Sequence, residues 1–286
     1  LQQIFLEARD TLRQWREECA RRPEEVVEIW ELVLKKCPNF LEDELWIVYE
    51  QVIIAALDSN RSDVALDCLS VLHKKFPFSN RVLKLEAMHL EFLEDFDGAS
   101  EIYDQLSSKD PTNMFYRKRK LAILKAQGKR AELIKELTEY LKVFINDNEA
   151  WLELSNLYLQ ERDYAHAAYC MEELVLSNPH NSLYSRRLAE IKYAQGGQGN
   201  YEVAKTYFEH ALKINTKCMR SLYGLMQVTN LLAETSSGQK QKEYVQTGTQ
   251  AANRILDILK KVSGEKSSLS YEIKAVENVK QQFESF

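Results

Sequence analysis

Glycine and proline are scarce in this sequence, with 9 glycines and 5 prolines among 286 residues. There is also no long stretch in which β-branched and polar residues alternate, the pattern that indicates a half-buried strand. Both absences favour helices over strands. Hydrophobic residues make up 45% of the chain and charged residues 28%, so a sizeable core can be buried beneath a charged surface, which argues against disorder.

Cysteines are few and far apart. The five are Cys19, Cys37, Cys68, Cys170 and Cys218, and no CxxC pair occurs, so their spacing suggests neither a zinc site nor a disulfide framework. We expect reduced thiols, as in cytosolic or nuclear proteins. The longest apolar run, Val52 to Leu57, has six residues, whereas a membrane-spanning helix needs about 20, so no spanning segment is expected.

A strong excess of one charge is missing as well. The chain has 38 basic and 43 acidic residues, which gives a formal net charge of −5. A protein that holds a polyanion along its length is usually basic. Nucleic acid is therefore not expected as a partner.

What the sequence does contain is a repeating pattern with a period of about 34 residues. Pro111 follows Pro77 after one period, and Pro179 follows Pro111 after two. A column of mostly small residues keeps the same spacing: Ala65, Ala99, Leu133 and Ala167. This period is typical of tetratricopeptide repeats, helix pairs that stack on their neighbours. The sequence therefore predicts an all-α superhelical solenoid.

The best copy of the repeat spans residues 148–181. Eight of its residues fall at the consensus places of the tetratricopeptide repeat: Trp151, Leu154, Ser155, Tyr158, Ala167, Met171, Leu174 and Pro179. Small residues such as Ala167 are expected where the second helix crosses the first, because a larger side chain would force the helices apart. Proline ends the second helix because it lacks an N–H and its ring clashes with the preceding turn.

The period divides the chain into three predicted regions. The middle one holds five repeats, at residues 46–79, 80–113, 114–147, 148–181 and 182–218. The fifth carries three extra residues, which we assign to the turn with Gly196, Gly197 and Gly199. A nucleotide-binding loop would follow a strand and continue with Gly-Lys-Ser/Thr. We therefore interpret this turn as an elongated loop between two helices.

The two ends are predicted to cap the array. Residues 1–45 form a degenerate N-terminal repeat, in which Pro23 begins a helix and Pro38 ends the second helix. Its first helix is expected to direct three side chains to the core: Ile4, Leu12 and Trp15.

Residues 219–286 form C-terminal capping helices, two of them near 243–261 and 268–284, after a loop from Glu234 to Lys242. The last helix is expected to turn five side chains inward: Tyr271, Ile273, Val276, Val279 and Phe283.

No pattern in the sequence indicates catalysis, a cofactor or a metal. The five histidines form neither an HExxH motif nor a Cys/His cluster with zinc spacing. His166 and Cys170 are four residues apart and could share a helix face, but two ligands are too few for a structural metal site. We predict a protein that is not an enzyme.

The strongest local charge feature is a basic run, Arg117 to Lys120, which continues at Lys125, Lys129 and Arg130. It can be a solvated helix face, or part of it can bind an acidic partner segment or phosphate groups. In tetratricopeptide repeats the first helices line a concave groove. The groove would then hold Phe115 among four cations, a plausible peptide-docking surface: Arg81, Lys84, Lys118 and Lys125.

One well-known groove of this fold grips the carboxylate end of heat-shock chaperones with lysines and asparagines at set positions. Two of those positions hold Ile54 and Met88 here, and Asn156 has Leu152 beside it. The carboxylate clamp is therefore not assembled. A chaperone adaptor, another tetratricopeptide assembly scaffold and a nucleic-acid-associated assembly factor remain alternative functions.

Beyond the generic repeat, the chain resembles the second subunit of the endoplasmic-reticulum membrane protein complex. The resemblance runs in order through RQWREE (13–18), DELWIVYEQVIIAALD (43–58), DPTNMFYRKRKLAILKAQGK (110–129), residues 149–197, YFEHALKIN (207–215) and IKAVE (273–277). It implies a scaffold subunit on the cytosolic face of the endoplasmic-reticulum membrane, in a complex that inserts transmembrane segments, including tail anchors.

The same resemblance implies the partners: cytosolic parts of membrane-spanning subunits and a further soluble subunit. Membrane association would then come through these partners and not through a spanning segment. Our hypothesis is that six first-helix residues, here called the predicted groove residues, hold an extended partner segment: Arg81, Lys84, Phe115, Lys118, Lys125 and Asn156.

Overall fold

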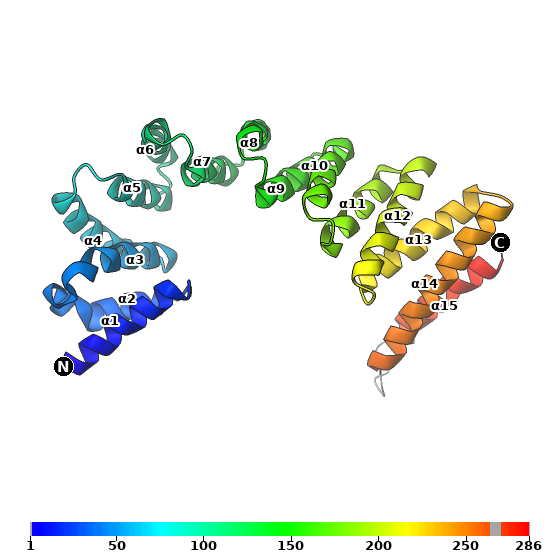
Figure 1. Cartoon of the computed structure of the whole chain (residues 1–286), viewed down its shortest axis with the longest axis horizontal. Helices are drawn as coiled ribbons and strands as arrows, with labels where there is room; N and C mark the ends of the chain where they lie inside the picture. Colours follow the sequence, from blue (N-terminus) through cyan, green and yellow to red (C-terminus); the bar gives the residue numbers. More distant parts are fainter. Residues whose placement is uncertain (1, 264–269, 286) are drawn as a thin grey trace. The chain divides into compact units, whose positions relative to one another are not determined.

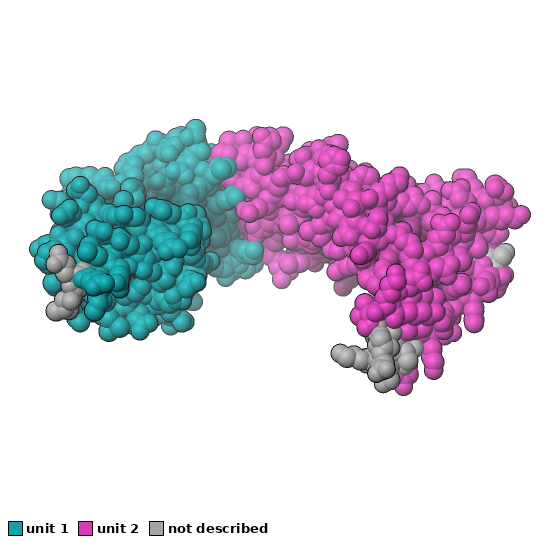
Figure 2. Space-filling model, turned by 60° about the horizontal axis from the view of Figure 1, so that its bottom comes forward, with its two compact units in different colours: residues 1–129 teal, residues 130–286 magenta. Residues whose placement is uncertain are grey.

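The structure, a computed structural model, describes residues 2–263 and 270–285. In those ranges every regular element is a helix (Figure 1). The all-α tetratricopeptide solenoid predicted from the sequence period is confirmed. The chain divides into two compact units, residues 1–129 and 130–286, coloured separately in Figure 2. This division falls between the two helices of the third predicted repeat, and each unit is described here by itself.

Unit 1 begins with a helix pair, two short 3₁₀ segments and five further helices of regular length. Its elements are α1 (Gln2–Glu17), α2 (Pro23–Leu32), η1 (Leu34–Lys36), η2 (Pro38–Glu44), α3 (Leu45–Asp58), α4 (Ser62–Lys75), α5 (Asn80–Phe92), α6 (Phe96–Lys109) and α7 (Met114–Ala126). Successive helices pack against each other, as the pairs α3–α4 and α5–α6 do.

Unit 2 continues in the same manner and ends in longer helices. Its elements are α8 (Arg130–Val143), α9 (Asn148–Gln160), α10 (Tyr164–Ser177), α11 (Ser182–Gln195), α12 (Gln198–Ile214), α13 (Met219–Thr235), α14 (Gln239–Ser263) and α15 (Ser270–Glu284). The last three helices pack in sequence, α13 on α14 and α14 on α15.

The period of the sequence reappears in the helix ends. Four second helices end at intervals of one period, at Lys75, Lys109, Val143 and Ser177. In three of them a proline stands two residues beyond the last helical residue: Pro77, Pro111 and Pro179. Ile145 holds that position after α8, and the helix still ends in register. Proline therefore reinforces an end that the packing of the repeats also sets.

The turns inside the repeats share a feature that the sequence does not reveal. One position in each turn has a positive φ, and these positions again follow each other at one period: Asn60 (60°), Glu94 (61°), Gly128 (71°), Arg162 (59°) and Gly196 (77°). In the last turn the next residue, Gly197 (91°), has a positive φ as well. Glycine adopts this left-handed conformation without a steric cost, whereas other L-residues pay a penalty. Asparagine and glycine, which hold three of the five positions, often adopt this conformation, but Glu94 and Arg162 are not residue types that favour it. The sequence therefore does not predict the whole column.

Small residues lie at the helix crossings, as their spacing suggested. The side chains of Ala65, Ala99 and Ala167 are fully buried in the second helices. In the α9–α10 hairpin the hydroxyl of Ser155 donates a hydrogen bond to the carbonyl oxygen of Ala167, at 3.1 Å, inside the core. A backbone approach this close requires a small side chain at the crossing.

The N-terminal cap differs from its prediction in two places. Leu12 is fully buried and Trp15 packs against the core of unit 1, but Ile4 is 55% exposed and its predicted core position is wrong. Pro23 begins α2 as expected. Pro38 does not end a second helix, because α2 already ends at Leu32 and Pro38 instead begins η2.

The extra residues of the fifth repeat do not lengthen the turn. α12 begins at Gln198, one period after the start of α10, but ends at Ile214, three residues later than the period predicts. The insertion therefore becomes almost one extra turn of α12, and Gly199 lies within that helix. Our interpretation of an elongated loop was wrong, since helix continuation satisfies the backbone hydrogen bonds of the added residues.

Of the two C-terminal helices, α14 (Gln239–Ser263) extends beyond its predicted bounds of 243–261. α14 begins at Gln239, so only three residues, 236–238, separate it from α13. α15 is described from Ser270, and the predicted helix positions 268 and 269 lie outside the described residues. Val276 and Phe283 are buried, with Ile273 and Val279 packed against the same core. Tyr271, which we expected to face inward, is 80% exposed.

Candidate partner-binding surface

The structure brings three of the predicted groove residues together in unit 1. Lys84 on α5 places its Nζ 4.7 Å from the ring centroid of Phe115 on α7, within cation–π range. Lys84 and Arg81 both form ion pairs with Glu50 on α3, the former at 3.8 Å. Three successive first helices therefore share one continuous set of contacts, in which Glu50 offsets part of the positive charge.

Lys118 and Lys125 lie on α7 with Phe115. The side chain of Lys118 is half-buried and that of Lys125 is exposed. Two other members of the basic run contact acidic residues of α5 and α6: Arg119 pairs with Glu91, and Lys120 pairs with Asp104 at 2.5 Å. Arg130, the last member of the basic run, lies in unit 2 and pairs there with Glu161 at 3.5 Å. Ion pairs with acidic residues thus take up part of the run.

Arg119 belongs to a semi-buried network with Glu91 and Tyr103. Its guanidinium donates to both carboxylate oxygens of Glu91, at 2.9 and 2.5 Å, and the Tyr103 hydroxyl donates to Oε1 at 2.5 Å. Burial, then the bond to Glu91, raises the pKa of Tyr103. Burial alone would lower the pKa of Arg119, but the contacts with Glu91 outweigh it and the pKa is raised. The Tyr103 hydroxyl therefore stays neutral and the Arg119 guanidinium stays charged, and the network joins α5, α6 and α7.

Asn156 belongs to unit 2, where its Oδ1 accepts a hydrogen bond from Nη2 of Arg187 on α11 at 2.7 Å. One step further along the unit, Arg220 on α13 pairs with Glu190 on α11 at 2.7 Å. Polar contacts between successive first helices thus occur in unit 2 as they do in unit 1.

The sequence indicated the cations of this surface but not their partners. Glu50 lies 31 residues before Arg81, Glu91 lies 28 before Arg119, and Asn156 lies 31 before Arg187. These separations are a few residues short of one repeat. An arginine at that spacing after a glutamate or an asparagine is the signal that could have predicted the pairs, because this spacing places the two residues on adjacent first helices.

A separate opening lies at the start of unit 1, between α1 and the segment that carries η1 and η2. Its volume is about 960 Å³. Large apolar side chains around it are exposed, among them Ile4 (55%), Leu32 (58%) and Phe40 (68%). An exposed group of apolar side chains beside polar ones is a common mark of an interaction surface.

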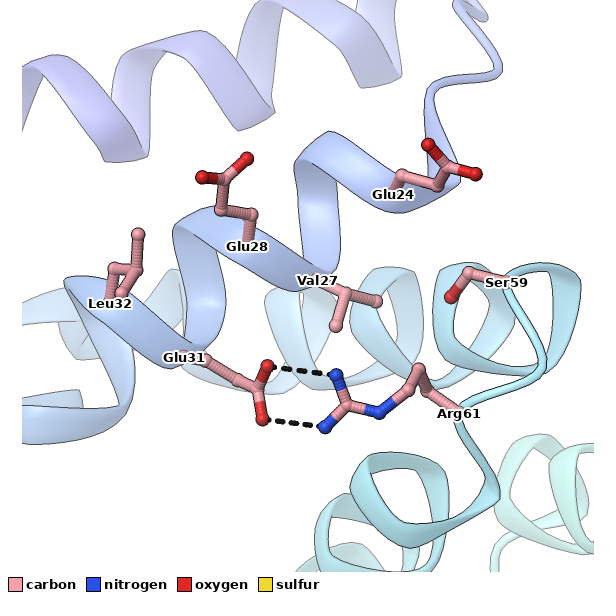
Figure 3. A pocket seen from close by; sticks show the side chains of 7 residues that line it. All are labelled: Glu24, Val27, Glu28, Glu31, Leu32, Ser59 and Arg61. Carbon is pink, nitrogen blue, oxygen red and sulfur yellow. Dashed lines mark hydrogen bonds and ion pairs between the residues drawn. The ribbon is translucent and has the colours of Figure 1, made fainter.

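A smaller pocket of about 370 Å³ lies between α2 and the start of α4 (Figure 3). Arg61 points at Glu31 across it and donates two hydrogen bonds to that carboxylate, at 2.8 and 3.1 Å. Arg61 also binds Asp63, and this contact lowers the pKa of Asp63 to about 2. The charges that face each other in this pocket are thus already paired.

His166 and Cys170 do not form a common site. The side chain of His166 is exposed and its Nδ1 contacts Asp163 at 2.7 Å, whereas Cys170 is buried and burial raises the pKa of its thiol to about 12. Within residues 2–263 and 270–285, no group of three or more His, Cys, Asp or Glu side chains could hold a metal ion. No helix in these same ranges has the length and apolar character to cross a membrane.

Comparison with known proteins identifies the family. The family model described as the EMC2 TPR-like repeat domain matches residues 64–206. ER membrane protein complex subunit 2-A of Xenopus laevis is 44% identical over 273 residues, which cover 95% of this chain and 92% of the relative. This chain belongs to the ER membrane protein complex subunit 2 family. The resemblance that the sequence segments suggested is confirmed.

More distant relatives agree with this membership. ER membrane protein complex subunit 2 of Dictyostelium discoideum is 32% identical over 89% of this chain and 83% of its own length. Among solved structures, the C-terminal part of a TPR repeat-containing protein from Cytophaga hutchinsonii aligns with a TM-score of 0.57 at 12% identity. The alignment covers 94% of this chain and 93% of that one. At such low identity, this similarity concerns the fold alone.

Proposed function

We propose that this chain is a non-catalytic scaffold subunit of an endoplasmic-reticulum membrane protein complex. In this proposal it lies on the cytosolic face of the membrane and organises partner subunits for the insertion of transmembrane segments, of tail-anchored and multipass proteins alike. The observation that carries the proposal is the 44% identity over nearly the whole of a relative that bears the name of such a subunit. The family model, at residues 64–206, spans every helix that supplies a predicted groove residue.

The first-helix surface supports a scaffold role in physical terms. In unit 1 it offers Lys84 over the Phe115 ring, and the exposed side chain of Lys125 lies on the same helix as that ring. Basic side chains beside an aromatic ring suit an extended acidic segment of a partner. The chaperone-adaptor alternative gains no support, because two positions of the carboxylate clamp hold Ile54 and Met88.

Charge reversal on α7 tests this surface. Lys118→Glu combined with Lys125→Glu should reduce the recovery of at least one partner subunit after affinity purification by about tenfold, a loss of about 1.4 kcal/mol in binding. Helical content, measured by circular dichroism, should stay unchanged because neither side chain is in the buried core.

The matched control reverses two exposed lysines of unit 2, Lys213→Glu with Lys217→Glu, and should leave recovery as it is. Recovery of every partner from the α7 variant would rule out the groove as the docking surface. Enrichment of heat-shock proteins or RNA, without endoplasmic-reticulum subunits, would instead support one of the alternative functions.

Protease added to sealed microsomes tests the proposed location. A chain held on the cytosolic face should be digested without detergent, and depletion of its membrane-spanning partners should release it from the membrane fraction. Protection of the chain until detergent is added would overturn the cytosolic placement.

A further inference from the structure

The turn between α4 and α5 in unit 1 carries an unusual side chain. Phe78 is 91% exposed, more than any other large apolar residue in the described ranges. One, two and three periods later the same position holds polar residues: Thr112, Asn146 and His180. The repeat therefore does not require phenylalanine here, and a side chain this exposed adds almost nothing to the core.

A pocket of about 190 Å³ adjoins this turn. Its wall includes Trp46 and Phe76, whose rings meet edge to face with centroids 5.1 Å apart, and Ile47, which is 45% exposed. Pockets for drug-sized ligands measure about 300–1,000 Å³. The smaller volume and the aromatic wall suit a single apolar side chain.

Cations surround the turn. Lys74 and Lys75 end α4 and are exposed, and Nζ of Lys75 lies 5.8 Å from the Trp46 ring centroid. Arg81, which lines the pocket, is 71% exposed. The carboxylate that lines the pocket, Glu50, is already paired with Arg81 and Lys84. Cations thus outnumber carboxylates among the charged side chains named around the pocket.

The start of α5 also favours a carboxylate as a partner. The residues before α7, α9 and α11 each accept a hydrogen bond from a backbone N–H of their helix: Asn113, Asp147 and Asn181. Ser79, the corresponding residue before α5, lines the pocket and makes no such bond, and neither do Glu44 before α3 and Cys218 before α13. A carboxylate from outside can take the place that these side chains fill elsewhere.

We propose that the α4–α5 turn and its pocket, here called the turn site, dock a protein segment in which one large apolar side chain is flanked by carboxylates. The apolar side chain enters the pocket beside Trp46 and Phe76 and covers Phe78, and the carboxylates meet Lys74, Lys75 and Arg81. The proposal rests on this local geometry and not on which complex the chain joins.

The test uses the full chain and a labelled synthetic peptide with one phenylalanine between two pairs of aspartates, with binding followed by fluorescence anisotropy. Phe78→Ser should weaken binding about tenfold, as loss of an aromatic contact at the centre of an interface does. Lys74→Ala with Lys75→Ala should weaken it several-fold, and the loss should shrink at high salt because the contacts are electrostatic.

Three controls show whether the turn site itself binds the peptide. A peptide with lysines in place of the aspartates should bind at least about tenfold more weakly, given the positive surface. Ile145→Ser, which alters another exposed apolar turn residue (61%), should bind the acidic peptide like the parent. Charge reversal at Lys118 and Lys125 removes any binding of this peptide to the α7 groove. Binding that remains in that variant and is lost on Phe78→Ser belongs to the turn site, so failure of the α7 groove and failure of the turn site can be distinguished.

Several results would overturn the proposal. Absence of binding to the acidic peptide would do so, as would equal binding of parent and Phe78→Ser chains. The last experiment measures binding of the chain to vesicles of phosphatidylcholine with and without phosphatidylserine. Capture of the chain by the anionic vesicles, lost in Phe78→Ser, without peptide binding would assign the turn to a membrane surface instead of a protein segment.

Discussion

Two regions can be compared: the α9–α10 hairpin of unit 2, and the N-terminal region of unit 1 from α1 to α3. They are built from similar helices, but the helices are capped and connected differently. In the hairpin, Asp147 and Asp163 cap the two helices, Arg162 makes the left-handed turn, and Ala167 fills the crossing. In the N-terminal region α2 and α3 begin without a side-chain cap, and two 3₁₀ segments replace a second helix of regular length.

The difference shows which region leaves apolar side chains exposed. The regular hairpin caps both of its helices, buries its crossing completely and packs against its neighbours α8 and α11. In the N-terminal region Glu42 has φ 48° and ψ −122°, and an opening of about 960 Å³ remains beside exposed Leu32 and Phe40. Departure from the repeat thus coincides with apolar surface that a partner can cover.

The largest expected effect comes from overpacking the regular hairpin. Ala167→Leu should lower the free energy of unfolding by about 1–3 kcal/mol, because the fully buried side chain has no room for three more carbons. Urea denaturation followed by circular dichroism measures the change.

The control for this comparison is Leu32→Ser in the N-terminal region, where the side chain is 58% exposed. It should change stability by less than about 0.5 kcal/mol. Equal losses in both variants would mean that the two regions do not differ in packing as the structure indicates.

An intermediate effect is expected at the left-handed turn position. Arg162→Gly should raise the free energy of unfolding by about 0.5–1 kcal/mol, since glycine removes the steric cost of a positive φ and loses part of this gain to its greater freedom in the unfolded chain. Hydrogen exchange of the α9 and α10 amides should slow accordingly.

The reverse substitution one period earlier is the natural check. Gly128→Ala should lower stability by a similar amount, although open space surrounds the glycine, because its φ is +71°. A gain in stability from this alanine would show that the column of left-handed residues carries no conformational cost.

The smallest effect concerns the cap of α10. The hydrogen bond from the His166 N–H is the first cause that lowers the pKa of Asp163 below its ordinary value. A carboxyl with a lowered folded-state pKa stabilises the fold above its unfolded pKa of about 3.9, and this contribution is lost as the pH falls through the folded pKa. Asp163→Asn keeps a capping oxygen that does not titrate.

As the pH falls from about 7 to about 3, the parent chain should therefore lose more stability than the Asp163→Asn chain. The stabilities of the two chains should approach each other or cross. Thermal unfolding at a series of pH values measures this difference. A difference that stays constant over that range would exclude the cap as a titrating contact.

The sequence by itself determined the repeat, the ends of three second helices and the family. These properties depend on residues close together in the chain, such as Pro179 two positions after α10, or on similarity along its whole length. The six predicted groove residues could also be selected from the period alone, although their role as a binding surface stays a prediction.

Tertiary structure decided which side chains meet. Glu50 reaches Arg81 and Glu91 reaches Arg119 only because neighbouring repeats stack, and no local pattern distinguishes these paired cations from Lys74 and Lys75. The same applies to exposure. Tyr271 carries the apolar character of a core residue, yet its side chain is 80% exposed. Helix formation is governed by neighbours in sequence, whereas charge pairing and burial are governed by neighbours in space.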